Sequence, residues 1–314
     1  DFDYGVQATP SISEVYLHNT CDLACVYCFP WYSSKINQEL KSYGTYPIGI
    51  QPVEEHSDRD QFFNAYLTWL KNNISKLTRL SILGGEPFLQ KEFWVILDLL
   101  AEFQNPNLEI SVNTNLNCNQ QVLDRFINTA KDLTRKRNIR QVHVSASLDC
   151  WGPQAEFVRY GLDTNRWLAN FETLNQHQWL ALSVHQVITA LTIKTAGELQ
   201  TKIAEFKKSN PKILQEYYVV DSGFEKIYHP EIFGNTFFKQ DLGKLLQEFP
   251  VVTDWDKNSR QRLEGIVQLL NTSIVDHTRL VMLKQTLDQI DHRRGTDWKK
   301  LWPEIAKFFE EHKV

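Results

Sequence analysis

The 314-residue sequence lacks any apolar run long enough to cross a membrane, because residues 93–100, among its longest such stretches, are interrupted by Asp98. It also lacks an excess of positive charge, since 34 Lys and Arg stand against 38 Asp and Glu. A broad basic face for nucleic acid is therefore disfavoured. The amino terminus shows no basic segment followed by an apolar one, so no secretion signal is indicated. We predict neither a membrane partner nor a nucleic-acid partner.

Methionine is almost absent, and cysteine is scarce. The single methionine is Met282 and the sequence begins at Asp1, so we expect a processed or trimmed chain and leave open that an amino-terminal segment is missing. The five cysteines are an odd number, and three of them lie within eight residues. A disulfide framework would spread its cysteines along the chain. We therefore predict a reducing, cytoplasmic location.

The first two thirds of the chain alternate β-rich runs with segments of helical periodicity. Strands are predicted over residues 13–18, 79–83, 108–112, 141–148, 182–188 and 216–220, with helices over residues 61–76, 91–104, 120–135, 165–177 and 195–208. Six β–α alternations in one direction favour parallel strands with helical crossovers. Both a doubly wound sheet and an open or partial barrel fit this α/β pattern.

After residue 221 the pattern changes from alternating elements to helices alone. Residues 221–235 are predicted to form a loop, followed by helices over residues 240–249, 259–274 and 277–290 and an amphipathic tail over residues 297–311. This pattern indicates a helical appendix on the α/β core. We therefore predict a core over residues 1–222 and a helical extension over residues 223–314.

Three cysteines, Cys21, Cys25 and Cys28, lie on a predicted loop directly after the first strand. Thiolates of this kind select zinc or an iron–sulfur cluster. A structural zinc site takes four ligands, and the remaining Cys118 and Cys150 are far away in the sequence. Three cysteines suit a [4Fe–4S] cluster with one open iron, where a substrate or cofactor binds. The alternative is a loop of free or zinc-binding cysteines.

The CxxxCxxC spacing, with Tyr27 immediately before the third cysteine, resembles the radical S-adenosylmethionine (SAM) superfamily. The segment Gly84-Gly85-Glu86-Pro87, directly after the second strand, is similar to the glycine-rich loop of that superfamily. Two glycines let a backbone approach a ligand closely, so we expect the strand end to hold the methionine ammonium of SAM while Glu86 orders the loop. The resemblance implies a partial (β/α)6 TIM-like barrel with a [4Fe–4S] cluster and SAM as cofactors.

Further polar residues stand at the predicted strand ends, where a parallel barrel collects its active site. By resemblance, the candidates for the SAM pocket are Asn113, Asn115, Ser145, Ser147, Asp149, Arg159 and, more weakly, Gln186 with Thr189. Arg159 is expected near the SAM carboxylate, because a guanidinium can pair bidentately with it. The alternative for Arg159 is a salt bridge on a helix surface. The implied chemistry is reductive cleavage of SAM to a 5′-deoxyadenosyl radical that abstracts a substrate hydrogen.

A finer resemblance is to the twitch/SPASM-like group, which includes peptide-modifying enzymes such as the spliceases. It rests on the motifs above together with Asp-His-Arg-Arg-Gly-Thr at residues 291–296. The group carries further cysteines for auxiliary clusters, and this sequence has none after Cys150. Either those ligands lie in a missing amino-terminal segment or the enzyme uses one cluster. An insertion at residues 31–58 carries Trp31, Tyr32, Tyr43 and Tyr46, which suit gripping a peptide or packing as a lid.

The resemblance implies a ribosomally made precursor peptide as substrate, with a small leader-recognition protein, and flavodoxin or ferredoxin as electron donor. A radical SAM enzyme for a small metabolite or nucleotide is the first alternative. A non-catalytic iron–sulfur or zinc protein is the second. We predict no catalytic residue and no residue of the substrate pocket from the sequence.

Overall fold

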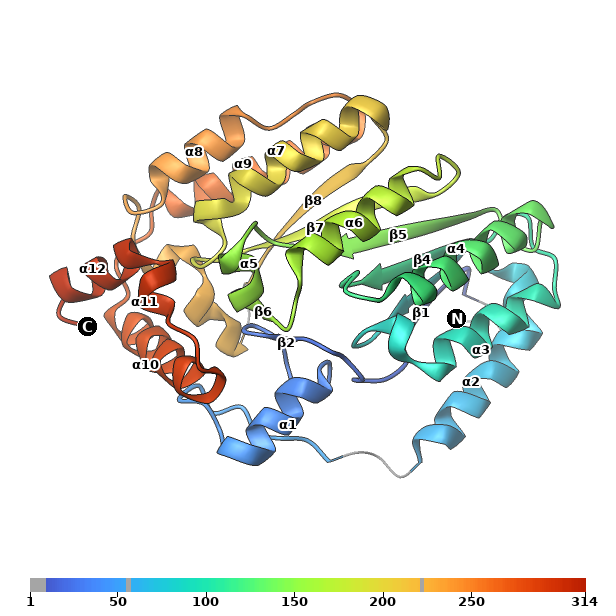
Figure 1. Cartoon of the computed structure of the whole chain (residues 1–314), viewed down its shortest axis with the longest axis horizontal. Coiled ribbons are helices and arrows are strands. Elements are labelled where there is room, and N and C mark those ends of the chain that lie inside the picture. Colours follow the sequence, from blue (N-terminus) through green and yellow to red (C-terminus); the bar gives the residue numbers. More distant parts are fainter. Residues whose placement is uncertain (1–9, 55–57, 221–222) are drawn as a thin grey trace, which may run out of the picture.

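The computed structural model describes residues 10–54, 58–220 and 223–314. Its centre is a six-stranded sheet whose neighbouring strands are all parallel (Figure 1). The strands are β1 (Ile12–Tyr16), β3 (Arg79–Leu83), β4 (Glu109–Thr114), β5 (Gln141–Ser147), β7 (Ala181–Ile188) and β8 (Leu214–Val219). They lie side by side in chain order, β1-β3-β4-β5-β7-β8. In a doubly wound sheet the order of the strands reverses part-way across the sheet. The order observed here does not reverse, which confirms the predicted partial (β/α)6 barrel.

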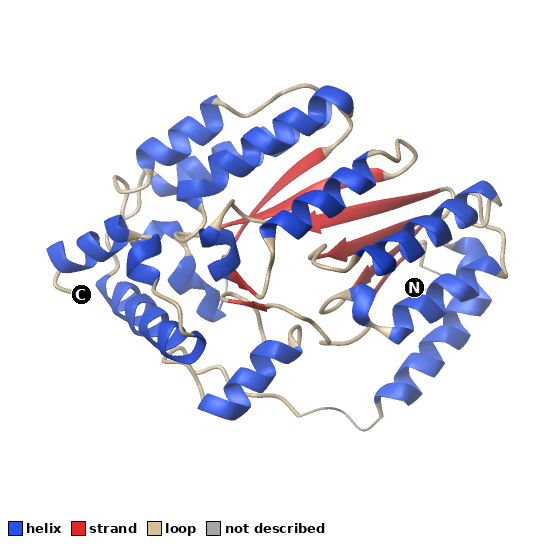
Figure 2. Ribbon diagram, viewed as in Figure 1, coloured by secondary structure: helices blue, strands red, loops and turns tan. Residues whose placement is uncertain are grey.

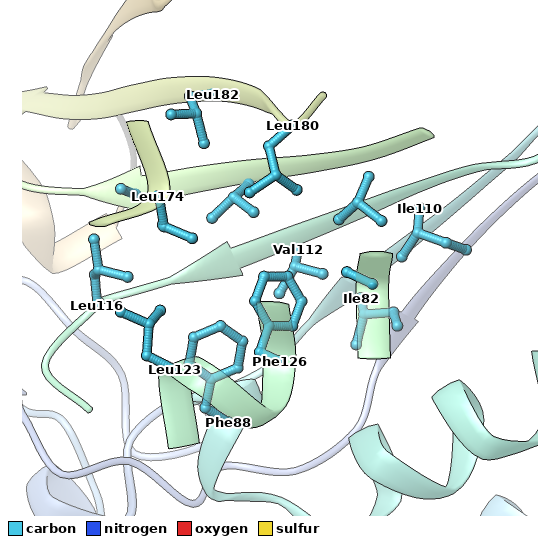
Figure 3. Packing of buried hydrophobic residues seen from close by; sticks show 14 of the residues in the cluster. Ile82, Phe88, Ile110, Val112, Leu116, Leu123, Phe126, Leu174, Leu180 and Leu182 are labelled. Atoms are coloured by element: carbon cyan, nitrogen blue, oxygen red, sulfur yellow. The ribbon is translucent and has the colours of Figure 1, made fainter. Parts of the chain in front are cut away.

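Helices cover the outer face of the sheet, and Figure 2 shows this layer in front of the strands. They are α2 (Arg59–Asn73), α3 (Lys91–Ala101), α4 (Gln120–Arg135), α6 (Thr164–Asn175) and α7 (Ile193–Ser209), with short 3-10 turns at Ile74–Lys76 and Pro87–Leu89. In α4, the Asn119 side chain caps the first turn by accepting from the Val122 amide. The same helix contributes Leu123 and Phe126 to the hydrophobic cluster that includes Ile110 and Val112 of β4, and Figure 3 shows Phe126 beside Val112.

The two faces of the sheet differ sharply in polarity because successive side chains of a strand point to opposite sides. On β4, Ile110 and Val112 are buried among the helices, whereas Ser111 and Asn113 line an interior cavity of about 630 Å³. The other strands contribute to the same cavity with Glu14, Ser81, His143, Ser145, His185 and Glu216. The inner face of the partial barrel is therefore polar, while its outer face forms the hydrophobic core.

Short elements lie at the carboxyl ends of the strands. Strands β2 (Ala24–Cys25) and β6 (Arg159–Tyr160) pair antiparallel, and α5 (Pro153–Val158) leads into β6. The insertion expected after the third cysteine folds in part into α1 (Ser34–Tyr43), which begins where the Ser33 side chain accepts from the Ile36 amide. A polar N-cap thus forms a helix where the sequence indicated only an irregular segment.

The chain after residue 222 is helical, as predicted. It contains 3-10 turns at Gly223–Tyr228 and Pro230–Ile232 and the helices α8 (Lys239–Gln247), α9 (Asp254–Leu270), α10 (His277–Arg294), α11 (Trp298–Leu301) and α12 (Pro303–Glu311). Helix α9 begins earlier than expected because Thr253 and Asp256 form a capping box. Buried Trp302 donates from Nε1 to the Leu191 carbonyl at 3.0 Å. The domain boundary at residue 222 stays a prediction.

Among the described residues, no helix is both long and apolar enough to cross a membrane.

We predict that Lys207→Met destabilises the fold strongly. Lys207 of α7 and Asp256 of α9 form an ion pair whose side chains are 1% and 0% exposed, so removing the ammonium leaves a buried carboxylate without its partner. Such a loss costs about 3–5 kcal/mol. The matched control is Lys208→Met, since the Lys208 side chain is 71% exposed and pairs with Glu205; it should cost less than about 1 kcal/mol. Urea unfolding measures both, and equal losses would contradict the prediction.

Candidate active site at the cysteine loop

The three clustered cysteines lie on one loop that hydrogen bonds hold in place from both sides. Ser33 Oγ donates to the Leu23 carbonyl at 2.7 Å, and Ser34 Oγ accepts from the Cys21 amide at 3.1 Å. The Cys28 amide donates to the Cys25 carbonyl at 3.0 Å. Cys25 itself belongs to β2 and stands opposite Arg159 of β6. The loop is therefore fixed both by the start of α1 and by the small antiparallel sheet.

The surroundings of the thiols decide whether a metal cluster fits them. Burial raises the pKa of Cys21 and of Cys28 well above the ordinary value, and the neighbouring Cys25 raises each further. Burial also raises the pKa of Cys25, and the cations Arg159 and Arg294 partly oppose that effect. Three bare thiolates are thus unfavourable here, whereas bound iron would supply the positive charge that keeps coordinating thiols deprotonated. The donor set fits an iron–sulfur cluster.

Within the described ranges, no three His, Cys, Asp or Glu side chains are grouped as ligands of a single metal ion. The ligands of one ion all lie within bonding distance of the same point. In a [4Fe–4S] cluster each cysteine binds a different iron, so the three sulfur atoms stand farther apart. The lack of such a grouping among the described residues therefore concerns single-ion sites only.

The glycines of the Gly84-Gly85-Glu86-Pro87 segment allow this loop to contact the chain just before the cysteines. A Cβ atom on Gly85 would lie 2.3 Å from the Thr20 carbonyl oxygen, and one on Gly84 would lie 2.7 Å from the His18 carbonyl oxygen. The Gly85 amide donates to the His18 carbonyl and the Glu86 amide donates to the Thr20 carbonyl, each at 2.7 Å. Backbone packing within the chain therefore accounts for both glycines, and the expected contact of this loop with a ligand stays a prediction.

Glu86 connects this glycine loop to the end of β4. Its carboxylate is buried and accepts from Thr114 Oγ1 at 2.8 Å and from the Asn115 amide at 2.7 Å. The side chain of Asn115 then donates to Asp22 Oδ1 at 2.7 Å. Glu86 therefore orders the loop, as expected, and Pro87 begins the short 3-10 turn that follows. The contact to Asp22 brings the β4 end against the cysteine loop.

A second polar cluster joins the cysteine loop to the end of β5. Arg159 donates from Nε and Nη2 to Asp149, each at 2.8 Å, with both residues buried. Tyr27 Oη donates to the same carboxylate at 2.6 Å, and the Val187 amide does so at 3.0 Å. The salt bridge of Arg159 is therefore buried and does not lie on a helix surface, and the expected approach of Arg159 to the SAM carboxylate stays a prediction. Two of its nitrogen atoms are engaged by Asp149, at the centre of the site.

Most of the sequence matches a known protein family. The model of the radical SAM superfamily matches residues 15–207. The chain belongs to the radical SAM superfamily. Solved structures with a similar fold include SuiB of Streptococcus suis bound to S-adenosylmethionine, with 18% identity and a TM-score of 0.47 over 76% of this chain and 46% of that one. SuiB bound to its precursor peptide SuiA gives 16% identity and a TM-score of 0.47 over 76% and 45%.

The chain thus spans less than half the length of these SuiB structures. No curated protein matches the sequence.

In this member of the radical SAM superfamily, three of the five remaining predicted residues lie on the inner wall of the barrel. Thr189 follows the end of β7, and its Oγ1 accepts from the Leu191 amide at 3.2 Å. Asn113 and Ser145 line the interior cavity, and Ser147 follows on the same face of β5. Gln186 lies on the outer face, fully buried beside Gln215, and it donates to the Asp149 carbonyl at 3.2 Å. Its position does not support the predicted cofactor contact, because one step along the pleat turns the side chain away from the cavity.

Sequence reasoning missed His185, which β7 presents to the cavity in place of Gln186. His185 Nε2 lies 2.7 Å from Glu216 Oε2 and 3.4 Å from Ser145 Oγ. It also missed Asn117, whose side chain donates to Asp22 Oδ2 at 3.0 Å and to the Gly161 carbonyl at 3.1 Å. Strict alternation along the strand could have indicated His185. The repeated asparagines at 113, 115 and 117 could have indicated Asn117.

The extension supplies a further residue that the sequence did not place in the site. Arg294, at the end of α10, donates from Nε to Glu39 of α1 at 2.9 Å, and its side chain is 2% exposed. Tyr160 of β6 donates from Oη to the Arg294 carbonyl at 3.4 Å. A cation of the extension is therefore held beside the small sheet that carries Cys25.

Gly85→Ala should destabilise the protein by about 1–3 kcal/mol, because the added methyl group overlaps the Thr20 backbone. The control is Gly197→Ala in α7, where no atom lies within 4 Å of the added methyl. Removing a helical glycine at an open position stabilises by about 0.5–1 kcal/mol. Thermal unfolding with calorimetry measures the two effects, and a neutral Gly85→Ala variant would refute the backbone-packing explanation.

Glu86 should make the stability of the cofactor-free protein depend on pH. Burial raises the pKa of Glu86 from 4.5 to about 7, against the hydrogen bonds that favour its ionised form. Because the folded-state pKa is the higher one, its stabilising effect is complete below about 4.5 and is lost as the pH rises towards 7. As the pH rises from about 4.5 to about 7, the urea concentration at the midpoint of unfolding should therefore fall for wild type relative to the Glu86→Gln variant. A constant difference would show that Glu86 titrates normally.

Proposed function

We propose that this radical SAM enzyme binds a [4Fe–4S] cluster through Cys21, Cys25 and Cys28 and binds SAM at the open iron. The observation that carries the proposal is that three thiols share one braced loop, against which the glycine loop and the ends of β4 and β5 converge. The chemistry that the bound cofactors supply is one-electron cleavage of SAM to a radical able to abstract hydrogen.

The residues of the chain itself hold this loop and supply charge around it. Arg159 and Arg294 lie near Cys25 and offset the negative charge that three thiolates bring. Asp149 fixes Arg159 bidentately, and Tyr27 donates to the same carboxylate. Asn113, Ser145 and Ser147 offer hydrogen bonds for SAM from the inner wall. Asn115 donates to Asp22 and so holds the end of β4 against the cysteine loop.

We further propose that the substrate is a ribosomally made precursor peptide, including splicease-type excision of a backbone unit. The motifs that resemble the twitch/SPASM-like group support this assignment. We take residues 1–222 as the radical SAM core and residues 223–314 as the helical extension. Because no cysteine follows Cys150 in this sequence, either the ligands of auxiliary clusters lie in a further amino-terminal segment or the enzyme uses one cluster. A small leader-recognition protein, a flavodoxin or ferredoxin donor, and a cytoplasmic location complete the proposal.

A small polar metabolite is the second candidate substrate, and the interior cavity favours it. The cavity measures about 630 Å³ and presents His143, Ser145, His185 and Glu216. His185 Nε2, 2.7 Å from Glu216, can exchange a proton with a bound hydroxyl or amine. A gene for a short precursor peptide beside the gene of this enzyme would favour the peptide, and its absence would favour the metabolite.

Cys25→Ala should abolish both cluster binding and SAM cleavage. The protein is reconstituted anaerobically with iron and sulfide, reduced, and given SAM, and 5′-deoxyadenosine is measured by chromatography. Wild type should hold close to four irons per chain and form the product. Cys118→Ala is the matched control, because Cys118 is buried outside the loop and contacts Asn170; it should keep both properties.

Two results would contradict the proposal in different ways. Iron binding by Cys25→Ala equal to that of wild type would place the cluster elsewhere. A complete cluster in wild type without any 5′-deoxyadenosine would favour the non-catalytic iron–sulfur protein.

A further inference from the structure

Strand β4 ends in a turn with a strained backbone. Leu116, two residues after the strand, has a φ of 56°, which lies in the left-handed region that a leucine rarely adopts. Its side chain is nonetheless fully buried, and Figure 3 shows it just beyond the end of the strand. Backbone strain of this kind persists only where the surroundings fix it, and it concentrates at functional sites.

Hydrogen bonds within the turn and from a neighbouring helix fix this backbone. The Leu116 amide donates to Thr114 Oγ1 at 3.0 Å. The Asn117 amide donates to Asn115 Oδ1 at 2.9 Å. Asn170 of α6 donates from Nδ2 to the Leu116 carbonyl at 2.9 Å. All of these side chains are buried, so the turn is held in one arrangement.

The turn directs two amide side chains at the cysteine loop. Asn115 donates from Nδ2 to Asp22 Oδ1 at 2.7 Å. Asn117 donates from Nδ2 to Asp22 Oδ2 at 3.0 Å. Asp22 directly follows Cys21 in the sequence, so both bonds fix the part of the loop that carries the first cysteine. Towards Asp22 the two asparagines therefore have the same role.

Asn115 makes a further contact that Asn117 does not make. Its Nδ2 also lies 3.9 Å from Cys21 Sγ, within the range of a hydrogen bond to sulfur. A side-chain amide carries two hydrogens, so one of them can bind Asp22 while the other faces the sulfur. In Asn117 the amide reaches the Gly161 carbonyl instead, at 3.1 Å. The sulfur contact thus distinguishes the two asparagines.

A hydrogen bond to a ligand sulfur changes the reduction potential of an iron–sulfur cluster. Reduction adds negative charge, part of which lies on the sulfur atoms, so a donor there stabilises the reduced form more than the oxidised form. Asn115 is 7% exposed, and at such a buried position solvent weakens a hydrogen bond little. Its backbone amide donates to Glu86 Oε2 at 2.7 Å. The donor is therefore held in place by the fold itself.

We propose that Asn115 is a positioning residue that raises the reduction potential of the bound cluster through an N–H···S hydrogen bond to Cys21, and that the strained turn at Leu116 keeps its amide in that position. This inference rests on the proposed function, because it needs a cluster on the cysteine loop. A higher potential would let a given electron donor reduce a larger share of the clusters. The competing explanation is that Asn115 only anchors Asp22, as Asn117 does.

The experiment compares two substitutions that each remove one hydrogen bond to Asp22. Asn115→Leu also removes the contact with the Cys21 sulfur, whereas the matched control Asn117→Leu leaves that contact intact. Wild type and both variants are reconstituted anaerobically with iron and sulfide. Each is then titrated with dithionite in the presence of redox mediators and without SAM. Electron paramagnetic resonance measures the reduced cluster at each potential.

At the midpoint potential of wild type, the ratio of reduced to oxidised cluster should fall about tenfold in Asn115→Leu, which corresponds to about 59 mV for one electron. Asn117→Leu should titrate as wild type does. A second variant, Asn115→Ser, keeps an oxygen that can accept from the Asn117 amide but carries no amide hydrogens. It should shift the potential in the same direction, so it decides the question where the leucine variant does not fold.

Equal potentials in wild type and in the Asn115 variants would overturn the proposal. An equal shift in Asn117→Leu would do so as well, because the loss of an anchor on Asp22 would then explain both results. Loss of iron from both Asn115 variants, with Asn117→Leu fully loaded, would assign Asn115 to cluster binding and overturn the tuning role.

Iron and sulfide contents of the same samples separate this inference from the proposed function. Wild type without iron would overturn the proposed function and this inference with it. Complete clusters with equal potentials would overturn this inference alone. Because the titration contains no SAM, its result does not depend on the formation of 5′-deoxyadenosine.

Discussion

The buried ion pair between Asp149 and Arg159 is the interaction on which the site depends. Asp149 is 1% exposed and Arg159 is 7% exposed, and the carboxylate also accepts from Tyr27 and from the Val187 amide. Since a buried charge that loses its partner costs several kcal/mol, these four groups hold one another in a single arrangement. That arrangement joins the main sheet, at β5 and β7, to the small sheet that contains Cys25.

The extension belongs to the same construction although it follows the sheet in the sequence. Residues of the cysteine loop and of α1, such as Val26 and Leu40, share one hydrophobic cluster with Leu283 and Trp302 of the carboxyl-terminal helices. Arg294 adds an ion pair to Glu39. The helices after residue 222 therefore stabilise the side of the loop that the barrel leaves uncovered, which explains why a cation of α10 lies close to Cys25.

The sequence allowed the strands, their parallel order and the residues of the loop to be predicted, because hydrophobic periodicity and cysteine spacing are local signals. It did not distinguish Gln186 from His185, since a one-residue shift in where a strand is judged to end exchanges the two faces. The role of Gly85 depends on the Thr20 backbone, 65 residues earlier in the chain. Arg294 meets Glu39 across 255 positions. Contacts of that range depend on tertiary packing, which no local pattern encodes.

A partial barrel has two edges, and the chain treats them differently. At β8, helix α9 packs along the strand, with Arg262 over the Tyr218 ring at 5.8 Å and Trp255 and Ser259 lining the interior cavity. At β1, the adjoining cleft is lined by Tyr16, Tyr32 and Phe62 and reaches His18 and Gly84 beside the cysteine loop. One end of the sheet is therefore covered by a helix of the carboxyl-terminal region, whereas the other borders a cleft with aromatic walls.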